Sequence, residues 1–247
     1  MAKLYLGNQE IIPVISQSKY GADINAILGD VDSLGFLRKP TGDFKLVFNG
    51  VKDIEASVLN YAFYGANSVT SVSFPDLEAL TDVASMNSAF LGNNITNVSF
   101  PKLTTISGQN AMTGAFSNNI ITSISMPELT TISGSNAMNN TFRNNYTLRN
   151  VTFPKLESLT AVNAMAVCFT QCNNIENIYF PALKTTSFGN TTNTQFTNLL
   201  GTTGTTVTHT IHFPSNLEST IQGLQGYPLF GGTNGYIVLA FDLPTTS

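Results

Sequence analysis

The stretch Phe74–Ser99, FPDLEALTDVASMNSAFLGNNITNVS, decides the fold because the chain repeats it. It recurs at once in residues 100–125, FPKLTTISGQNAMTGAFSNNIITSIS, and again from Met126 and from Phe153. Looser copies begin at Phe180 and Phe213, and residues 48–73 fit a degenerate first copy. The prolines that mark the copies lie 26, 26, 27, 27 and 33 residues apart: Pro75, Pro101, Pro127, Pro154, Pro181 and Pro214. A period of this length predicts a solenoid, a propeller or an array.

The spacing of apolar residues changes within each copy, and the change predicts the local structure. Met112 and Phe116 are four residues apart, which fits one face of a helical turn. The stretch that ends at Phe100 alternates apolar and polar residues, which is typical of a strand, and the next residue, a proline, gives the ladder no N–H. Leu103 and Ile106 fit a second short strand. We therefore expect coils of strand, proline turn, short strand, helical turn and Asn-rich turn, stacked at roughly 4.8 Å around one core.

Paired asparagines recur near the end of each copy. Asparagine tolerates left-handed backbone and bonds to nearby main chain. We therefore expect a stacked ladder of side chains that satisfies buried backbone groups, in preference to a ligand-binding role. The predicted ladder consists of Asn94, Asn119, Asn145 and Asn174.

The repeat resembles the BspA-type leucine-rich repeat. The matching positions in one copy are Phe100-Pro101, Leu103, Ile106, Ala115-Phe116, Asn119, Ile121 and Ile124. Cys172 stands where that family often has its single cysteine, and the insertion Gly108–Met112 makes the period longer than is usual there. The resemblance implies a right-handed, β-rich leucine-rich-repeat solenoid of about 26-residue coils with capping ends. It also implies a surface or secreted protein that mediates adhesion and recognition, with no reaction tied to the fold.

Composition narrows the possible functions. Of the 247 residues, 42% are hydrophobic and only 11% are charged, so the polar surface consists of Thr, Ser and Asn. The net charge is −4 and no basic cluster occurs, which argues against a nucleic-acid partner. No apolar run approaches the roughly 20 residues of a membrane span. The first residues lack the apolar segment of a secretory signal. This indicates a trimmed domain or, as the initial Met1 favours, a protein that reaches its destination without secretion.

The first 45 residues do not fit the repeat and are expected to form a hairpin and a cap. Lys3–Ile15 alternates apolar residues on either side of Gly7-Asn8, which predicts a β-hairpin. This segment resembles openings found in tail and host-interaction proteins of phages and prophages of gut Gram-positive bacteria. Asp23–Phe36 has helical spacing and is expected to cover the open end of the solenoid.

The solenoid is predicted to occupy residues 46–220, and residues 221–247 are predicted to close its other end. Tyr236–Phe241 is apolar in both of its alternating rows, so this strand should be covered on two sides, by the chain itself or by a neighbouring subunit. The preceding strand carries His209 on the face of Ile211 and His212 on the opposite face. Surface positions are expected for both histidines.

The copy that begins at Phe180 carries an insertion, Leu199–Thr206, and insertions map to loops on one face of a solenoid. That loop is either a binding face or an inert polar excursion. As a ligand-binding site the sequence offers only its threonines: Thr202, Thr203, Thr205 and Thr206.

No constellation for catalysis, metal or cofactor appears in the sequence. Cys168 and Cys172 are four residues apart, which is poor for a disulfide and fits two buried thiols. Asp76, Lys102 and Glu128 share one repeat position, so neighbouring coils place opposite charges side by side. That arrangement explains these carboxylates without catalysis, and we predict a non-enzymatic protein with no cofactor and no metal.

Three functions remain open. The first is a phage or prophage tail-associated virion protein that binds the host surface or other virion proteins. The second is a bacterial cell-surface or extracellular adhesin that binds host matrix protein or glycans. The third is an architectural spacer with no ligand. The sequence predicts no nucleic-acid partner and no membrane insertion, and it leaves homo-oligomerisation open.

Overall fold

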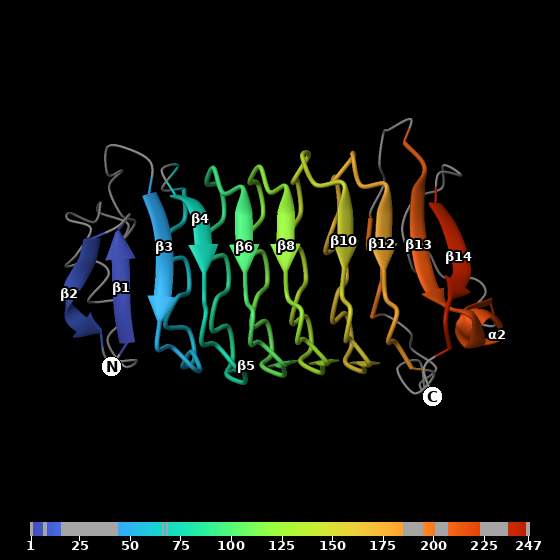
Figure 1. Cartoon of the computed structure of the whole chain (residues 1–247), viewed down its shortest axis with the longest axis horizontal. Helices are drawn as coiled ribbons and strands as arrows, with labels where there is room; N and C mark the ends of the chain where they lie inside the picture. The colour runs from blue at the N-terminus through green and yellow to red at the C-terminus, as the bar shows by residue number, and fades with distance from the viewer. Residues whose placement is uncertain are drawn as a thin grey trace.

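Each copy of the repeat forms one coil of a parallel β-solenoid of about six coils, as predicted. The computed structural model describes residues 2–6, 9–15, 44–65, 67, 69–184, 195–200, 207–222 and 237–245. Successive coils lie side by side along the long axis of the molecule, in chain order (Figure 1). We number the coils by their repeats: coil 1 is residues 48–73, coil 2 is 74–99, coil 3 is 100–125, coil 4 is 126–152, coil 5 is 153–179 and coil 6 is 180–212.

The longer strands form one side of the solenoid in two sheets. The first has the order β2-β1-β3-β4-β6-β8 and the second the order β10-β12-β13-β14. The first sheet is built from β1 (Ala2–Leu6), β2 (Gln9–Ile15), β3 (Phe44–Asn49), β4 (Val69–Ser73), β6 (Asn97–Ser99) and β8 (Ser123–Ser125). The second is built from β10 (Asn150–Thr152), β12 (Asn177–Tyr179), β13 (His209–Pro214) and β14 (Ile237–Leu243). From β3 onward the pairs are parallel, with the same repeat position opposite itself, as in Val72–Val98 and Val98–Ile124.

Short strands after each proline form a third, parallel sheet in the order β11-β9-β7-β5. They are β5 (Ala79–Leu80), β7 (Thr105–Ile106), β9 (Thr131–Ile132) and β11 (Ser158–Leu159). In each of these strands the first residue is half-buried and the second is fully buried. The apolar residues of the repeat therefore meet in one core between the sheets.

Two columns of stacked phenylalanines run through this core. One column, Phe63, Phe90, Phe116, Phe142 and Phe169, has ring centroids 5.2–5.8 Å apart. The other column stacks at 4.3–6.0 Å and consists of the residues before the prolines, with Met126 in place of one ring, together with Phe48 before Asn49 at one end and Phe241 of β14 at the other. Its rings are Phe48, Phe74, Phe100, Phe153, Phe180, Phe213 and Phe241. Equivalent repeat positions of successive coils lie next to one another. The rings therefore stack because the coils carry phenylalanine at the same repeat position.

The expected helical turn is absent, and a ladder of tight turns takes its place. Met86 and Phe90 are both fully buried, as their spacing predicts. However, the Phe90 N–H donates to Ala115 O of the next coil at 2.9 Å, while Ala89 N–H closes a turn on Met86 O at 3.1 Å. Alternate amides thus bond between coils and the others close local turns, so the helical prediction is wrong here. We call these segments, residues 57–65, 84–92, 110–118, 136–144, 163–171 and 195–200, the turn row.

The two ends differ from the coils. At the first end, β1 pairs antiparallel with both β2 and β3, which places the predicted hairpin against coil 1. The predicted cap at residues 23–36 lies outside the described residues, and the division of the chain at residues 45 and 220 stays a prediction. At the second end lie a 3-10 turn, Ser215–Leu217, and the short helix α2, Glu218–Gln222.

Strand β14 pairs in parallel with β13. One row of its side chains, Ile237, Leu239 and Phe241, packs partly against the core. On the other row Val238 is 46% exposed, so the described part of the chain does not cover this residue, and the predicted cover by a neighbouring subunit stays a prediction.

Candidate functional site

A buried ladder of polar side chains crosses the coils where the turn row ends. Asn119 Nδ2 donates to Phe90 O at 3.0 Å and to Phe116 O at 3.1 Å, and its Oδ1 accepts from Ile95 N–H at 3.0 Å. Asn145 makes the same bonds one coil later, to Phe116 O, Phe142 O and Ile121 N–H. These side chains satisfy backbone groups that no water reaches, which is a structural role.

Two members of the predicted ladder are out of register. Asn94 and Asn174 are exposed, and each donates to one turn carbonyl of the preceding coil, Asn67 O and Tyr146 O. The equivalent buried position is held by Asn93, whose Nδ2 donates to Phe63 O at 2.8 Å, and by Cys172, whose Sγ donates to Phe142 O at 3.0 Å. The asparagine pairs look alike in the sequence. However, the buried position falls on the first asparagine of the pair in coil 2, on the second in coils 3 and 4, and on the residue before the pair in coil 5.

The histidines also differ from expectation. His209 is fully buried, and its Nδ1 lies against Ile175 O, so the surface position predicted for it is wrong. His212 lies on the opposite face of β13, as strand alternation predicts. Its ring stacks on Tyr179 at 4.3 Å, and its two nitrogens contact Asp242 and Asn177. This cluster joins β12, β13 and β14 to one another.

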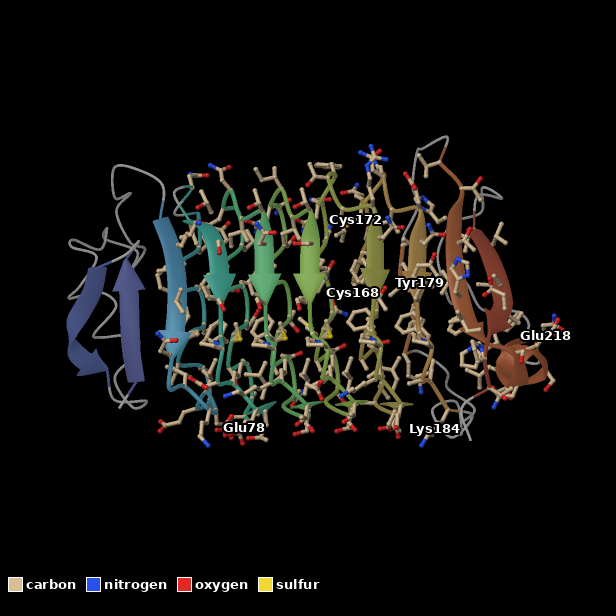
Figure 2. All side chains as sticks on the ribbon, in the orientation of Figure 1. Glu78, Cys168, Cys172, Tyr179, Lys184 and Glu218 are labelled. Atoms are coloured by element: carbon tan, nitrogen blue, oxygen red, sulfur yellow. The ribbon has the colours of Figure 1, made fainter. Side chains whose placement is uncertain are left out.

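Charged side chains gather as ion pairs between neighbouring coils. Lys102 Nζ lies 2.7 Å from Asp76 Oδ1, and Lys155 Nζ lies 2.6 Å from Glu128 Oε2. Opposite charges thus lie together at the repeat position that follows the proline, as predicted; we call this part of the coils the proline corner. The pairs Lys52–Glu78 and Glu157–Lys184 continue this arrangement, and Glu78 and Lys184 lie along one long edge of the molecule (Figure 2). The Lys102 side chain and the bonded Gly50 N–H lower the pKa of Asp76. These carboxylates are paired and exposed, which fits a surface role.

The predicted ligand-binding threonines, Thr202, Thr203, Thr205 and Thr206, lie outside the described residues. The site that the structure does show is a hollow of about 410 Å³ on the outside of the turn row. Three neighbouring coils line it, through the residues Ser88, Leu91, Thr113, Gly114, Ser117, Asn118, Asn140, Arg143 and Asn144. We call this site the hollow.

The hollow exists because equivalent positions of successive coils carry side chains of different size. At one position the coils carry Tyr61, Ser88, Gly114 and Asn140, and at another Tyr64, Leu91, Ser117 and Arg143. The smallest residues of both series, Gly114 and Ser117, fall in coil 3. A Cβ at Gly114 would meet Ser88 Oγ at 3.3 Å, and this glycine has a φ of +63°. Leu91 and Arg143 therefore rise on either side of a low floor.

The lining of the hollow combines polar groups with the apolar side chain of Leu91, and it carries a single formal charge. No carboxylate, histidine or cysteine is among its nine described residues; the charge belongs to Arg143. Within the described ranges, no group of three His, Cys, Asp or Glu side chains is placed to hold a metal ion. The described helices include none with the length and apolar character that a membrane crossing requires. The arrangement offers hydrogen bonds and one cation, which suits binding.

The repeat, its buried positions and its ladder now identify the family. The family model of the BspA type leucine rich repeat region matches six copies over residues 56–200, more than half of the chain. The chain belongs to this family. In this BspA-type repeat protein, Cys172 holds the place of Asn119 and Asn145 in the ladder, as its resemblance to the family's cysteine position implies. No curated protein and no solved structure matches the chain.

Sequence reasoning missed the hollow, although a signal for it was present. Aligning the turn-row segments column by column shows Gly114 and Ser117 between larger residues of coils 2 and 4. This difference in size predicts a hollow only if the side chains at these two repeat positions are known to point outward. Helical spacing would have assigned other residues to the surface.

Proposed function

We propose that the chain is a non-enzymatic recognition module that works at a bacterial cell surface or outside the cell and binds a partner through the outside of the turn row. Leucine-rich repeat solenoids are protein-binding scaffolds, and BspA-type members are typically found at those locations. The observation that carries the proposal is the hollow, where three coils together place hydroxyl, amide and guanidinium groups around a low floor. Host matrix proteins and glycans are the partners this predicts.

A second candidate is a tail-associated protein of a phage or prophage that binds the host surface. Its support is the sequence of Lys3–Ile15, which resembles openings of such proteins. Strands β1 and β2, which contain this segment, join the solenoid through β3. In this role the hairpin would attach to other virion proteins and the turn row would face the host.

Binding of the full chain to an array separates these possibilities. The array carries extracellular matrix proteins, glycans and whole gut Gram-positive bacteria. We expect specific binding to at least one class; binding to bacteria alone favours the virion candidate, and binding to matrix proteins or animal glycans favours the adhesin.

Two matched variants locate the surface that is used. Gly114→Asn fills the floor of the hollow with a residue that the next coil already carries at the same position, Asn140, with a φ of 55°. Ser125→Asn adds the same amide on the exposed face of β8. We expect Gly114→Asn to weaken binding and Ser125→Asn to leave it unchanged. Absence of binding to every class would overturn the proposal.

A further inference from the structure

We propose that the hollow binds a carboxylate-bearing sugar residue of an acidic glycan, with the carboxylate held by Arg143. This inference rests on the proposed recognition function and names the chemical class of its ligand. It follows from three features of the hollow: an unpaired guanidinium, the division of its other groups into donors and acceptors, and its shape.

The guanidinium of Arg143 has no partner charge among the residues that the structure describes. Other basic side chains, including Lys52, Lys102 and Arg149, form ion pairs at 2.7–2.9 Å. Arg143 is exposed and forms no ion pair with any residue that the structure describes. Its planar group suits a carboxylate, because the two can form paired hydrogen bonds. A ligand carboxylate would therefore meet a cation that has no competing anion in the lining.

Among the remaining polar groups, Asn118 supplies a donor, and Thr113 and Ser117 supply acceptors. Asn118 Oδ1 accepts from Asn144 Nδ2 at 2.6 Å, which orients Asn118 Nδ2 outward, where none of the described residues accepts from it. The hydroxyls of Thr113 and Ser117 donate to Asn136 O and Arg143 O, so they offer lone pairs to a ligand. Asn144 Oδ1 also lacks a partner in the described parts of the chain, but this oxygen is buried and out of reach of a ligand.

This division matches an acidic sugar. The donors, Arg143 and Asn118, suit an anionic group, and the acceptors suit hydroxyl groups that donate. A sialic acid or a uronic acid carries a carboxylate and several hydroxyls on one ring. An acidic peptide would bring carboxylates but few hydroxyl donors, and its apolar side chains would find only Leu91 to pack on.

The shape of the hollow fits the same ligand. A volume of about 410 Å³ lies in the range of small-molecule sites, roughly 300–1,000 Å³. Leu91 gives one apolar wall, against which the C–H groups of a sugar ring can pack. Gly114 keeps the floor low enough for the ring to lie between Leu91 and Arg143.

Calorimetric titration of the full chain with 3′-sialyllactose, glucuronic acid and lactose tests the proposal. We expect binding of at least one acidic sugar and none of lactose. Arg143→Gln should weaken that binding about tenfold or more, as for loss of a charge-assisted hydrogen bond. Arg149→Gln is the matched control, because it removes the same charge from an exposed residue paired with Glu176 elsewhere on the solenoid. We expect Arg149→Gln to bind like the parent chain.

Each other outcome overturns the inference. Equal binding of lactose and 3′-sialyllactose shows that the carboxylate is not recognised, and equal loss in both arginine variants shows a general charge effect. Binding of a poly-glutamate peptide, lost in Arg143→Gln, with no binding of either acidic sugar would assign the hollow to acidic peptides. If the array of the preceding subsection shows binding that Arg143→Gln leaves intact, this inference fails while the recognition function stands.

Discussion

At the scale of single residues, left-handed backbone explains why asparagine and glycine recur in the turn row. Every fourth residue there has positive φ: in coil 2 the last is Gly92 at 73°, in coil 3 it is Asn118 at 55°, and in coil 4 it is Asn144 at 61°. Glycine and asparagine accept this conformation at low cost, whereas a β-branched residue does not. Residues of other types hold some of these positions, among them Tyr61 and Ala84, but Val167 in coil 5, with a φ of 49°, is β-branched.

Val167→Asn should therefore stabilise the protein. Relief of the strained backbone should stabilise the folded chain by about 1 kcal/mol. Loss of the packing of the half-buried valine side chain offsets a small part of this gain. Asparagine already occupies the same position in coil 4, at Asn140. Thermal unfolding followed by circular dichroism should show a raised Tm. Val162→Asn, at a 50% exposed position without positive φ, is the control and should leave Tm unchanged or lower.

Asn119→Ala should strongly destabilise the protein. It leaves the buried Ile95 N–H without its partner. It also removes one of the two side-chain bonds that Phe90 O and Phe116 O each accept, because Asn93 and Asn145 still donate to these carbonyls. We expect a loss of about 2–3 kcal/mol in urea unfolding, since the one buried N–H left unsatisfied costs about 1–3 kcal/mol and the bonds to the two carbonyls are also lost. Asn94→Ala, which removes one exposed bond, should cost less than about 1 kcal/mol. Equal losses in the two variants would mean that the buried ladder does not support the turns.

At the scale of elements, the coils depend on very close approach of backbone in the proline-to-turn segment. A Cβ at Gly108 would lie 2.0 Å from Asp82 O, and a Cβ at Gly134 would lie 2.2 Å from Gly108 O. These carbonyls are main chain and cannot move aside as a side chain would. The insertion Gly108–Met112 lengthens the repeat, and its first residue must be glycine because a side chain there would collide with the backbone of the preceding coil.

Gly108→Ala should force coils 2 and 3 apart at this point. We expect Tm to fall by several degrees or more, because the backbone must shift in both coils. Ser107→Ala, one residue earlier and half-buried, is the control and should change Tm little. A Gly108→Ala protein with the parent Tm would show that the coils are not packed this closely.

Two buried thiols, Cys168 in the turn row and Cys172 in the ladder, should not react with thiol reagents in the folded chain. Burial raises the pKa of Cys172 to about 12 and raises the pKa of Cys168, next to it, well above its ordinary value. Because the thiolate is the reactive form, iodoacetamide at pH 8 should modify neither cysteine until the chain unfolds. Rapid modification of the folded chain, seen by mass spectrometry, would contradict the burial.

These raised pKa values also predict a dependence of stability on pH. In the unfolded chain a thiol ionises near about pH 8.5. The stabilisation that comes from keeping these thiols protonated in the folded chain is therefore complete below that pH. It is lost as the pH rises toward the raised pKa values of the folded chain. The free energy of unfolding should fall by up to about 1.4 kcal/mol per pH unit for each thiol in this range. The variant with both Cys168→Ala and Cys172→Ala should show a smaller slope, since only its other groups titrate.

The core could be predicted from the sequence, but the turns could not. Leu77, Ile106 and Phe116 are fully buried as their recurrence indicates, because recurrence marks the same position in every coil. The four-residue spacing of Met86 and Phe90 fits a helix and equally fits the turn row, where alternate amides bond between coils. Periodicity alone cannot separate two structures that bury the same residues. For the same reason the hollow, which depends on which columns face outward, needed the structure.

At the scale of the whole molecule, the solenoid separates its charges from its hollow. The ion pairs between coils, among them Lys102–Asp76 and Lys184–Glu157, use charges of both signs at the proline corner. The exposed strands β6 and β8 present Asn97, Ser123 and Ser125, which are uncharged. Arg143 is thus the one formal charge in the lining of the hollow, and recognition by the whole molecule is expected to centre there.

A crystal structure of the full chain with 3′-sialyllactose tests this account most directly. The account predicts the sugar in the hollow, with its carboxylate within hydrogen-bond distance of the Arg143 guanidinium and its ring over Gly114. Sugar bound on the faces of β6 and β8, or a hollow that stays empty while the sugar binds elsewhere, would contradict it.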